Sequence, residues 1–182
     1  MISARIRGLR RTLRVLRGRK GGPTLEVTTV FPCVNACRYC PQEQWRRAYR
    51  GKARLSLEEF RALLGRIPRD VRLDFSGFSE PFGNPDSSRM MRLACESGYD
   101  VALYTTLVGL RESDLDTLEG LHLYPCAVHL PDEEYFTVKD RPRWLETFRR
   151  FAERIPYDEA VYHLGAVPDD LAAAVGKIRR RP

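Results

Sequence analysis

The sequence predicts an α/β fold in which a parallel sheet carries helices on its outer side. Two observations predict this class. Apolar segments typical of buried strands alternate with amphipathic segments typical of helices. The alternation repeats five times, and no low-complexity segment interrupts it. Five units are too few to close an eight-stranded barrel, so we predict an open, partial (βα)5–6 TIM-like barrel with its functional site at the C-terminal ends of the strands.

Length and charge indicate one domain with basic ends. The 182 residues, 43% of them hydrophobic and 30% charged, suffice for a soluble domain with a sizeable core. The net charge of +7 comes from the ends, because residues 1–24 carry eight Arg or Lys and no acid, and residues 177–181 carry four more. The remaining 19 basic residues stand against 24 acidic ones. We therefore predict a basic N-terminal extension, 1–24, and a core domain, 25–182, whose acidic balance argues against nucleic acid as a partner.

The extension is predicted to be an amphipathic helix. Arginines fill the positions between apolar residues at near-helical spacing, which are Ile2, Ile6, Leu9, Leu13 and Leu16. Such a helix packs its apolar stripe on the domain or, alternatively, makes a peripheral membrane contact through residues 1–20. An export signal is not expected, because no apolar region follows Arg10-Arg11. No segment is apolar enough to span a membrane, so we expect a cytoplasmic protein.

The βα units can be placed in order after the break at Gly21-Gly22-Pro23. The expected strands are 25–31, 71–78, 101–107, 123–130 and 160–165. The expected helices that follow them are 56–67, 85–97, 112–121, 142–155 and 169–179. Two helix starts carry capping signals, since Ser56 precedes Glu59 by three residues and Asp169 opens the last helix.

Strand alternation predicts which side chains face the helices. In the second strand, Leu73, Phe75 and Gly77 share one face, and Asp74 and Ser76 share the other. In the fourth strand the apolar, helix-facing side chains are predicted to be Tyr124, Cys126, Val128 and Leu130. Ala127 and His129 would then point toward the interior of the curved sheet. Cys126 is therefore predicted to be a core residue, as is Cys95 beside Met90 and Met91.

Three cysteines with the spacing C-x3-C-x2-C follow the first strand, namely Cys33, Cys37 and Cys40. Three thiolates on one loop can hold three irons of a [4Fe-4S] cluster and leave the fourth iron open. A zinc site is the alternative, completed by one of His122, His129 or His163. Structural zinc usually needs a second cysteine pair, whereas Cys95 and Cys126 stand alone. A disulfide framework is disfavoured by the odd number of cysteines.

A second motif, Ser76-Gly77-Phe78-Ser79-Glu80-Pro81, stands at the end of the second strand. Glycine allows the backbone to approach a ligand closely. The Glu80 carboxylate can accept charge-assisted hydrogen bonds from an ammonium group. Alone, the motif favours a plain Gly/Pro turn with a solvated glutamate. Its place one βα unit after the cysteine loop favours a ligand-binding role.

The two motifs together resemble those of radical S-adenosylmethionine (SAM) enzymes, and the resemblance covers residues 25–176. It implies that Cys33, Cys37 and Cys40 hold a [4Fe-4S] cluster and act in catalysis, and that SAM binds the open iron. Contacts with SAM are implied for Tyr39, Gly77, Ser79, Glu80, Thr105, Thr106, His129, Asp132 and Gly165. The chain departs from the family pattern in one respect, because Phe78-Ser79 separate Gly77 from Glu80-Pro81.

The resemblance also implies a reaction. A one-electron reductant such as flavodoxin or ferredoxin would drive reductive cleavage of SAM, and a 5′-deoxyadenosyl radical would abstract hydrogen from a small polar substrate, sugar-like or from natural-product metabolism. The alternatives are a glycyl-radical-enzyme activase, a peptide-modifying radical SAM enzyme, a degenerate member without turnover, and a non-catalytic Fe-S or zinc-binding protein. The family core usually has one more βα unit, so a second copy of the chain or the N-terminal helix could close the open sheet edge.

Overall fold

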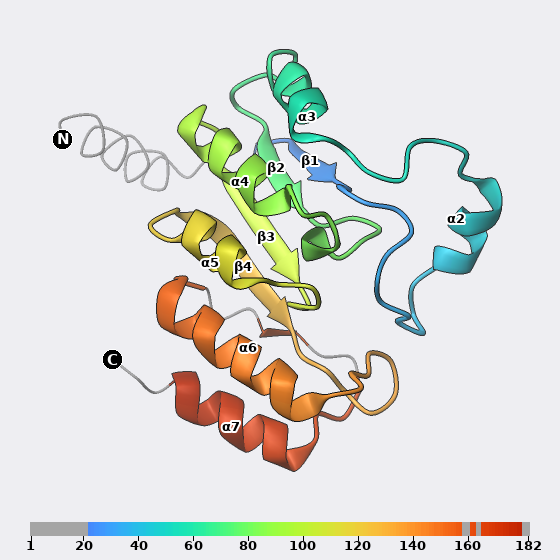
Figure 1. The fold of residues 1–182 in the computed structure, drawn as a ribbon, viewed down its shortest axis with the longest axis vertical. Helices are drawn as coiled ribbons and strands as arrows, with labels where there is room; N and C mark the ends of the chain where they lie inside the picture. The colour runs from blue at the N-terminus through green and yellow to red at the C-terminus, as the bar shows by residue number, and fades with distance from the viewer. Residues whose placement is uncertain (1–21, 158–160, 163–164, 180–182) are drawn as a thin grey trace.

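A five-stranded parallel sheet organises the computed structural model, which describes residues 22–157, 161–162 and 165–179 (Figure 1). The strands run in the spatial order of the sequence: β1 (Thr24–Val27), β2 (Arg72–Phe75), β3 (Val101–Thr105), β4 (Leu123–His129) and β5 (Val161–Tyr162). The predicted α/β class and open partial barrel are confirmed. The helix predicted in residues 1–20 lies outside the described residues.

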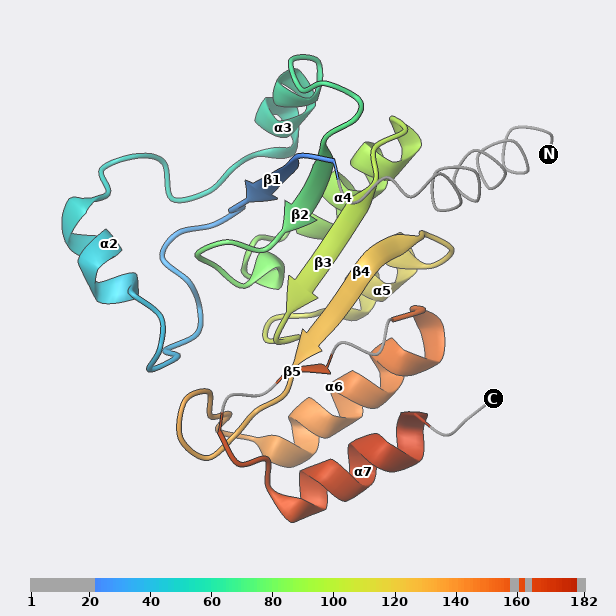
Figure 2. The same cartoon turned by 180° about the vertical axis from the view of Figure 1, so that it is seen from behind.

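A layer of helices covers one face of this sheet. The described helices are α2 (Gln42–Ala48), α3 (Leu57–Leu64), α4 (Ser87–Glu96), α5 (Glu112–Leu118), α6 (Arg141–Arg154) and α7 (Asp169–Arg179), with a 3-10 turn, η1, at Pro81–Gly83. Helix α2 lies to one side of the sheet and is not part of this layer (Figure 1). Figure 1 shows α3 to α6 as one layer in front of the strands, with α7 packed against α6. Figure 2, from behind, shows the face of the sheet that none of the described helices covers. No helix in the described part of the chain is long and apolar enough to cross a membrane.

The main core lies between the sheet and the helix layer. Leu73 and Phe75 of β2 are fully buried there, and the Phe75 ring meets Phe60 of α3 at a centroid distance of 5.7 Å. Asp74, on the opposite face of β2, pairs instead with Arg72 at 2.6 Å. The alternation predicted for Leu73, Asp74 and Phe75 is therefore confirmed, whereas β2 ends before Ser76 and Gly77. Cys126 is also fully buried in this core, as predicted, whereas Cys95 is partly buried against it.

The capping box predicted at Ser56 is confirmed. The Glu59 N–H donates to Ser56 Oγ at 3.2 Å, and the Ser56 N–H donates to the Glu59 carboxylate at 3.0 Å. Helix α2 and the turn η1 were not predicted. Within α2 the one buried residue is the polar Gln42, so this helix lacks the apolar stripe that marks an amphipathic helix.

The predicted orientation of Tyr124 is wrong. Its side chain is 54% exposed, whereas Leu123 is buried. The reason is an irregularity in the pairing of β3 with β4, in which Val101 pairs with Leu123 but Leu103 pairs with Cys126. The extra residue in β4 inverts the alternation before Cys126, so that Leu123, Cys126 and Val128 face the core.

Candidate functional site

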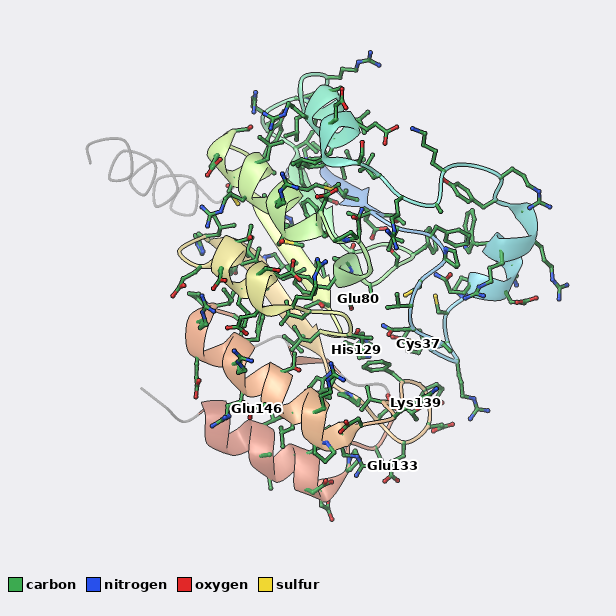
Figure 3. All side chains as sticks on the ribbon, viewed as in Figure 1. Cys37, Glu80, His129, Glu133, Lys139 and Glu146 are labelled. Carbon is green, nitrogen blue, oxygen red and sulfur yellow. The ribbon has the colours of Figure 1, made fainter. Side chains whose placement is uncertain are left out.

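The loops that leave the C-terminal ends of the strands meet at one edge of the sheet, where Figure 3 shows Cys37, Glu80 and His129. Hydrogen bonds join the first three loops. The Glu80 N–H donates to Cys33 Sγ at 3.1 Å, and Asn35 Nδ2 donates to Thr106 Oγ1 at 2.9 Å. The structure therefore brings the cysteine loop, the Glu80 loop and the end of β3 into direct contact, as expected for the C-terminal ends of neighbouring parallel strands.

The Glu80 carboxylate is buried at this edge, with 3% of the residue exposed. Its Oε1 accepts hydrogen bonds from Thr105 Oγ1 at 2.6 Å and from the Phe82 N–H at 3.2 Å. Its Oε2 accepts from the N–H and the hydroxyl of Thr106, both at 2.6 Å. Burial nevertheless raises the pKa of Glu80, and the four donors only oppose that shift. In the described part of the chain, no cationic side chain pairs with this carboxylate.

The three cysteines of the loop are free thiols and partly buried. Burial raises the pKa of Cys33, against hydrogen bonds from the Asn35 and Glu80 N–H groups. Burial also raises the pKa of Cys37 to about 11, with further contributions from Cys33 and Cys40. The thiols thus lie close enough to influence one another. Among the described residues, no group of three or more His, Cys, Asp or Glu side chains is arranged to hold a metal ion, so ligation by these cysteines stays a prediction.

The donor set nevertheless fits an iron–sulfur cluster and a polar ligand beside it. Three thiols on one partly exposed loop provide the sulfur ligands that such clusters use. Next to Glu80, the Ser79 Oγ is buried and has no hydrogen-bond partner among the described residues. A buried hydroxyl without a partner is uncommon, and a bound ligand would satisfy it.

Tyr39 and His129 form a stacked pair at this edge. Their ring centroids are 5.7 Å apart with an interplanar angle of 10°, and the Tyr39 hydroxyl lies 3.3 Å from His129 Nδ1. Burial, followed by the neighbouring Cys37, raises the pKa of Tyr39. One face of the Tyr39 ring therefore packs on His129. His163, the third zinc candidate, lies outside the described residues.

Asp132 organises the loop that follows β4. Its carboxylate accepts hydrogen bonds from the backbone N–H groups of Glu134 at 2.8 Å, Tyr135 at 2.5 Å and Phe136 at 3.3 Å. Although burial opposes it, these donors and the Gly165 N–H lower the pKa of Asp132. A Cβ on Gly165 would lie 2.7 Å from Asp132 Oδ1, so the two predicted site residues are adjacent. The structure thus gives Asp132 a role in shaping the loop.

Two buried amides of this edge were missed in the sequence. Gln42 accepts from the Cys33 N–H at 3.3 Å and donates to the Phe78 carbonyl, which joins both motif loops. Asn84 Nδ2 donates to the carbonyls of Thr29 and Leu55, both at 2.8 Å. No spacing signal could have identified these side chains, because their partners are distant in sequence.

Both the backbone conformation at position 77 and the nearby side chain of Thr28 require a glycine there. Its φ is +77°, and a Cβ there would lie 2.4 Å from Thr28 Oγ1. We expect Gly77→Ala to lower the free energy of unfolding by about 2–4 kcal/mol, from left-handed strain and overpacking together. Urea denaturation measures this. Gly98→Ala is the matched control, because Gly98 has φ +89° and nothing within 4 Å of a Cβ, and it should cost only about 1 kcal/mol. An equal loss of unfolding free energy in the two variants would show that Thr28 does not obstruct a side chain at position 77.

The fold and this edge together define an α/β protein with an open parallel sheet and a polar, cysteine-containing site at the C-terminal ends of its strands. The sequence matches no protein-family model and no curated protein. Among solved structures, the fold is similar to that of BtrN in complex with AdoMet and 2-DOIA, with a TM-score of 0.51 and 20% identity over 68% of this chain and 50% of BtrN.

Selenomethionine BtrN in an open conformation is a second match, with a TM-score of 0.46 and 19% identity over 61% of this chain and 51% of that one. The chain thus spans about half the length of BtrN. At this identity the similarity shows the fold alone.

Proposed function

We propose that this chain is a radical SAM enzyme that uses a [4Fe-4S] cluster. The observation that carries the proposal is the hydrogen bond from the Glu80 N–H to Cys33 Sγ, which places the predicted cluster loop against the predicted SAM loop. Cys33, Cys37 and Cys40 would hold the cluster. When bound, the cluster would supply the one electron that splits SAM into methionine and a 5′-deoxyadenosyl radical. The fold shared with AdoMet-bound BtrN supports the same assignment.

Several side chains of this edge would orient SAM. The Glu80 carboxyl is buried without a cationic partner in the described residues, so a ligand ammonium would stabilise its ionised form. The hydroxyls of Thr105 and Thr106 can rotate away to admit it, whereas the backbone donors of Phe82 and Thr106 stay fixed. The Ser79 hydroxyl supplies a further contact. Tyr39, His129, Asp132 and Gly165 complete the proposed SAM-binding edge.

The proposal also covers the substrate, the reductant and the oligomeric state. We propose a small polar substrate, sugar-like or from natural-product metabolism, and an external one-electron reductant such as flavodoxin or ferredoxin. A second copy of the chain would cover an edge of the sheet, since both β1 and β5 pair on one side only in the described structure. A cytoplasmic location and a peripheral membrane contact through residues 1–20 belong to the same proposal.

Anaerobic reconstitution tests the enzyme class. With iron, sulfide, dithionite and SAM, we expect the native chain to bind about four irons and to release 5′-deoxyadenosine. Cys37→Ala should bind little of the iron and release at least about 100-fold less 5′-deoxyadenosine, because the cluster lacks one ligand. Cys95→Ala is the matched control, since Cys95 lies in α4 away from the loop, and it should retain both properties. Iron counting and chromatography are the measurements.

The other outcomes separate the alternatives. Zinc in place of iron, or iron without 5′-deoxyadenosine, would contradict the proposal and indicate a structural or electron-transfer site. Product that forms only after a large glycine-containing enzyme is added would indicate a glycyl-radical-enzyme activase.

A further inference from the structure

A pocket separate from the proposed SAM edge lies where the segment after β1 meets α2 and α3. It is a largely apolar pocket of about 580 Å³, within the range of about 300–1,000 Å³ typical of small-molecule sites. None of the residues proposed to hold the cluster or SAM lines it. Two of its wall residues, Phe31 and Phe78, each stand two positions before a residue of the other site, Cys33 and Glu80.

Aromatic side chains form much of the wall. Trp45 of α2 and Phe78 contact each other with a centroid distance of 4.7 Å, and Phe31 meets Tyr49 edge-on at 5.0 Å. Trp45, Tyr49, Phe78 and Leu63 of α3 all remain 39–44% exposed. Such a concentration of exposed apolar side chains on one hollow is unusual for a surface without a binding role.

The wall is held in place before any ligand arrives. The Tyr49 hydroxyl donates to the Lys52 carbonyl at 2.8 Å, and a Cβ on Gly51 would lie 2.4 Å from that hydroxyl oxygen. Glycine at position 51 therefore allows the Tyr49 ring to fold back over the loop. A preformed wall reduces the ordering cost of binding.

The rim of the pocket is cationic. Lys52, Arg54 and Arg66 line it together with one carboxylate, that of Glu59. Glu59 is engaged by Lys52 and by the capping box of α3. In the described part of the chain, no carboxylate pairs with Arg54 or Arg66. The rim therefore keeps two formal positive charges beside an apolar wall, which favours a ligand with an acidic group.

We propose that this pocket binds an amphipathic anion, a small molecule with an apolar chain or ring and one acidic group. The apolar part would pack between Trp45, Phe78 and Leu63, and the acidic group would face Arg54 and Arg66. The proposal does not depend on SAM chemistry, so its failure and that of the proposed function are distinguishable.

Trp45 provides a direct readout of binding. The chain has two tryptophans, and Trp144 is 5% exposed in the core, so an added ligand should alter chiefly the emission of Trp45. Dodecanoate, titrated below its micelle concentration into the full chain, is the probe. We expect a saturable emission change. Dodecanol should bind at least about tenfold more weakly because it lacks the charge.

Paired variants test the location. Ala62 lines the pocket on α3 and Arg61 does not, so Ala62→Phe should weaken dodecanoate binding at least about tenfold and Arg61→Phe should leave it unchanged. Arg54→Glu combined with Arg66→Glu should abolish the preference for dodecanoate over dodecanol. Circular dichroism checks that each variant is folded.

Several results would overturn the proposal. They are the lack of a saturable change in Trp45 emission with dodecanoate, equal affinity for dodecanoate and dodecanol, and equal affinity of the Ala62→Phe and Arg61→Phe variants for dodecanoate. Saturation by a short acidic peptide rich in phenylalanine, without binding of dodecanoate, would assign the pocket to a protein partner and overturn it as well.

Discussion

Replacing Glu80 with alanine is expected to lower the free energy of unfolding by about 2–5 kcal/mol and to abolish SAM cleavage. The stability loss follows from the hydrogen bonds, because the variant leaves the Phe82 and Thr106 N–H groups buried without an acceptor. The two threonine hydroxyls can rotate to other partners and should add little. Urea denaturation gives the first quantity, and 5′-deoxyadenosine release by the reconstituted protein gives the second.

Two further variants separate stability from chemistry. Glu80→Gln keeps one acceptor oxygen and the shape of the side chain, so it should lose less stability than the alanine variant. It should still lose SAM cleavage if Glu80 meets a ligand ammonium, because a neutral amide cannot provide the charge. Glu133→Ala removes an exposed carboxylate and should change stability by less than about 0.5 kcal/mol. A Glu80→Ala protein that unfolds at the same urea concentration as the native chain would show that the carboxylate is not buried among these donors.

The sheet and its helix layer could be predicted because they depend on short-range pattern. Leu73 and Phe75 alternate with polar residues, and Ser56 stands at capping distance from Glu59. The orientation of Tyr124 was predicted wrongly for a local reason. A single extra residue in β4 inverts the alternation of buried and exposed side chains, and the hydrophobic pattern of the sequence does not reveal it. Helix α2 carries no apolar stripe, so its pattern resembles that of a loop.

The meeting of the two motif loops at one edge could be predicted from sequence, but the hydrogen bonds within that edge could not. Both motifs follow strands, and parallel topology then places Cys33 and Glu80 at one edge. The family resemblance implied that Thr105 and Thr106 contact the ligand. The structure shows that both bind the Glu80 carboxylate, which makes them residues that position it. The bridging amide of Gln42 depends on partners 9 and 36 residues away, and propensity carries no information about such pairs.

Asp132 is expected to make the stability of the fold sensitive to acid. Its pKa is lowered in the folded chain from the ordinary value of 3.8, because backbone donors outweigh the effect of burial. A lowered pKa means that the ionised form stabilises the folded state above the unfolded pKa, and that this contribution is lost as the pH falls through the folded pKa. The native chain should therefore lose stability more steeply than Asp132→Asn between about pH 4 and pH 2. Thermal unfolding across that interval measures the difference.

At pH 7, Asp132→Ala should cost about 2–4 kcal/mol, since the N–H groups of residues 134–136 lose their acceptor. The effect should also reach the cysteine loop. The Tyr135 carbonyl accepts the Arg38 N–H at 2.9 Å, next to Cys37, so a loosened loop should speed hydrogen exchange at Arg38. Exchange at Leu73, in the core, reports global unfolding and serves as the reference. An Arg38 amide whose exchange rises only in step with that of Leu73 would show that Asp132 stabilises the fold without holding the cysteine loop in place.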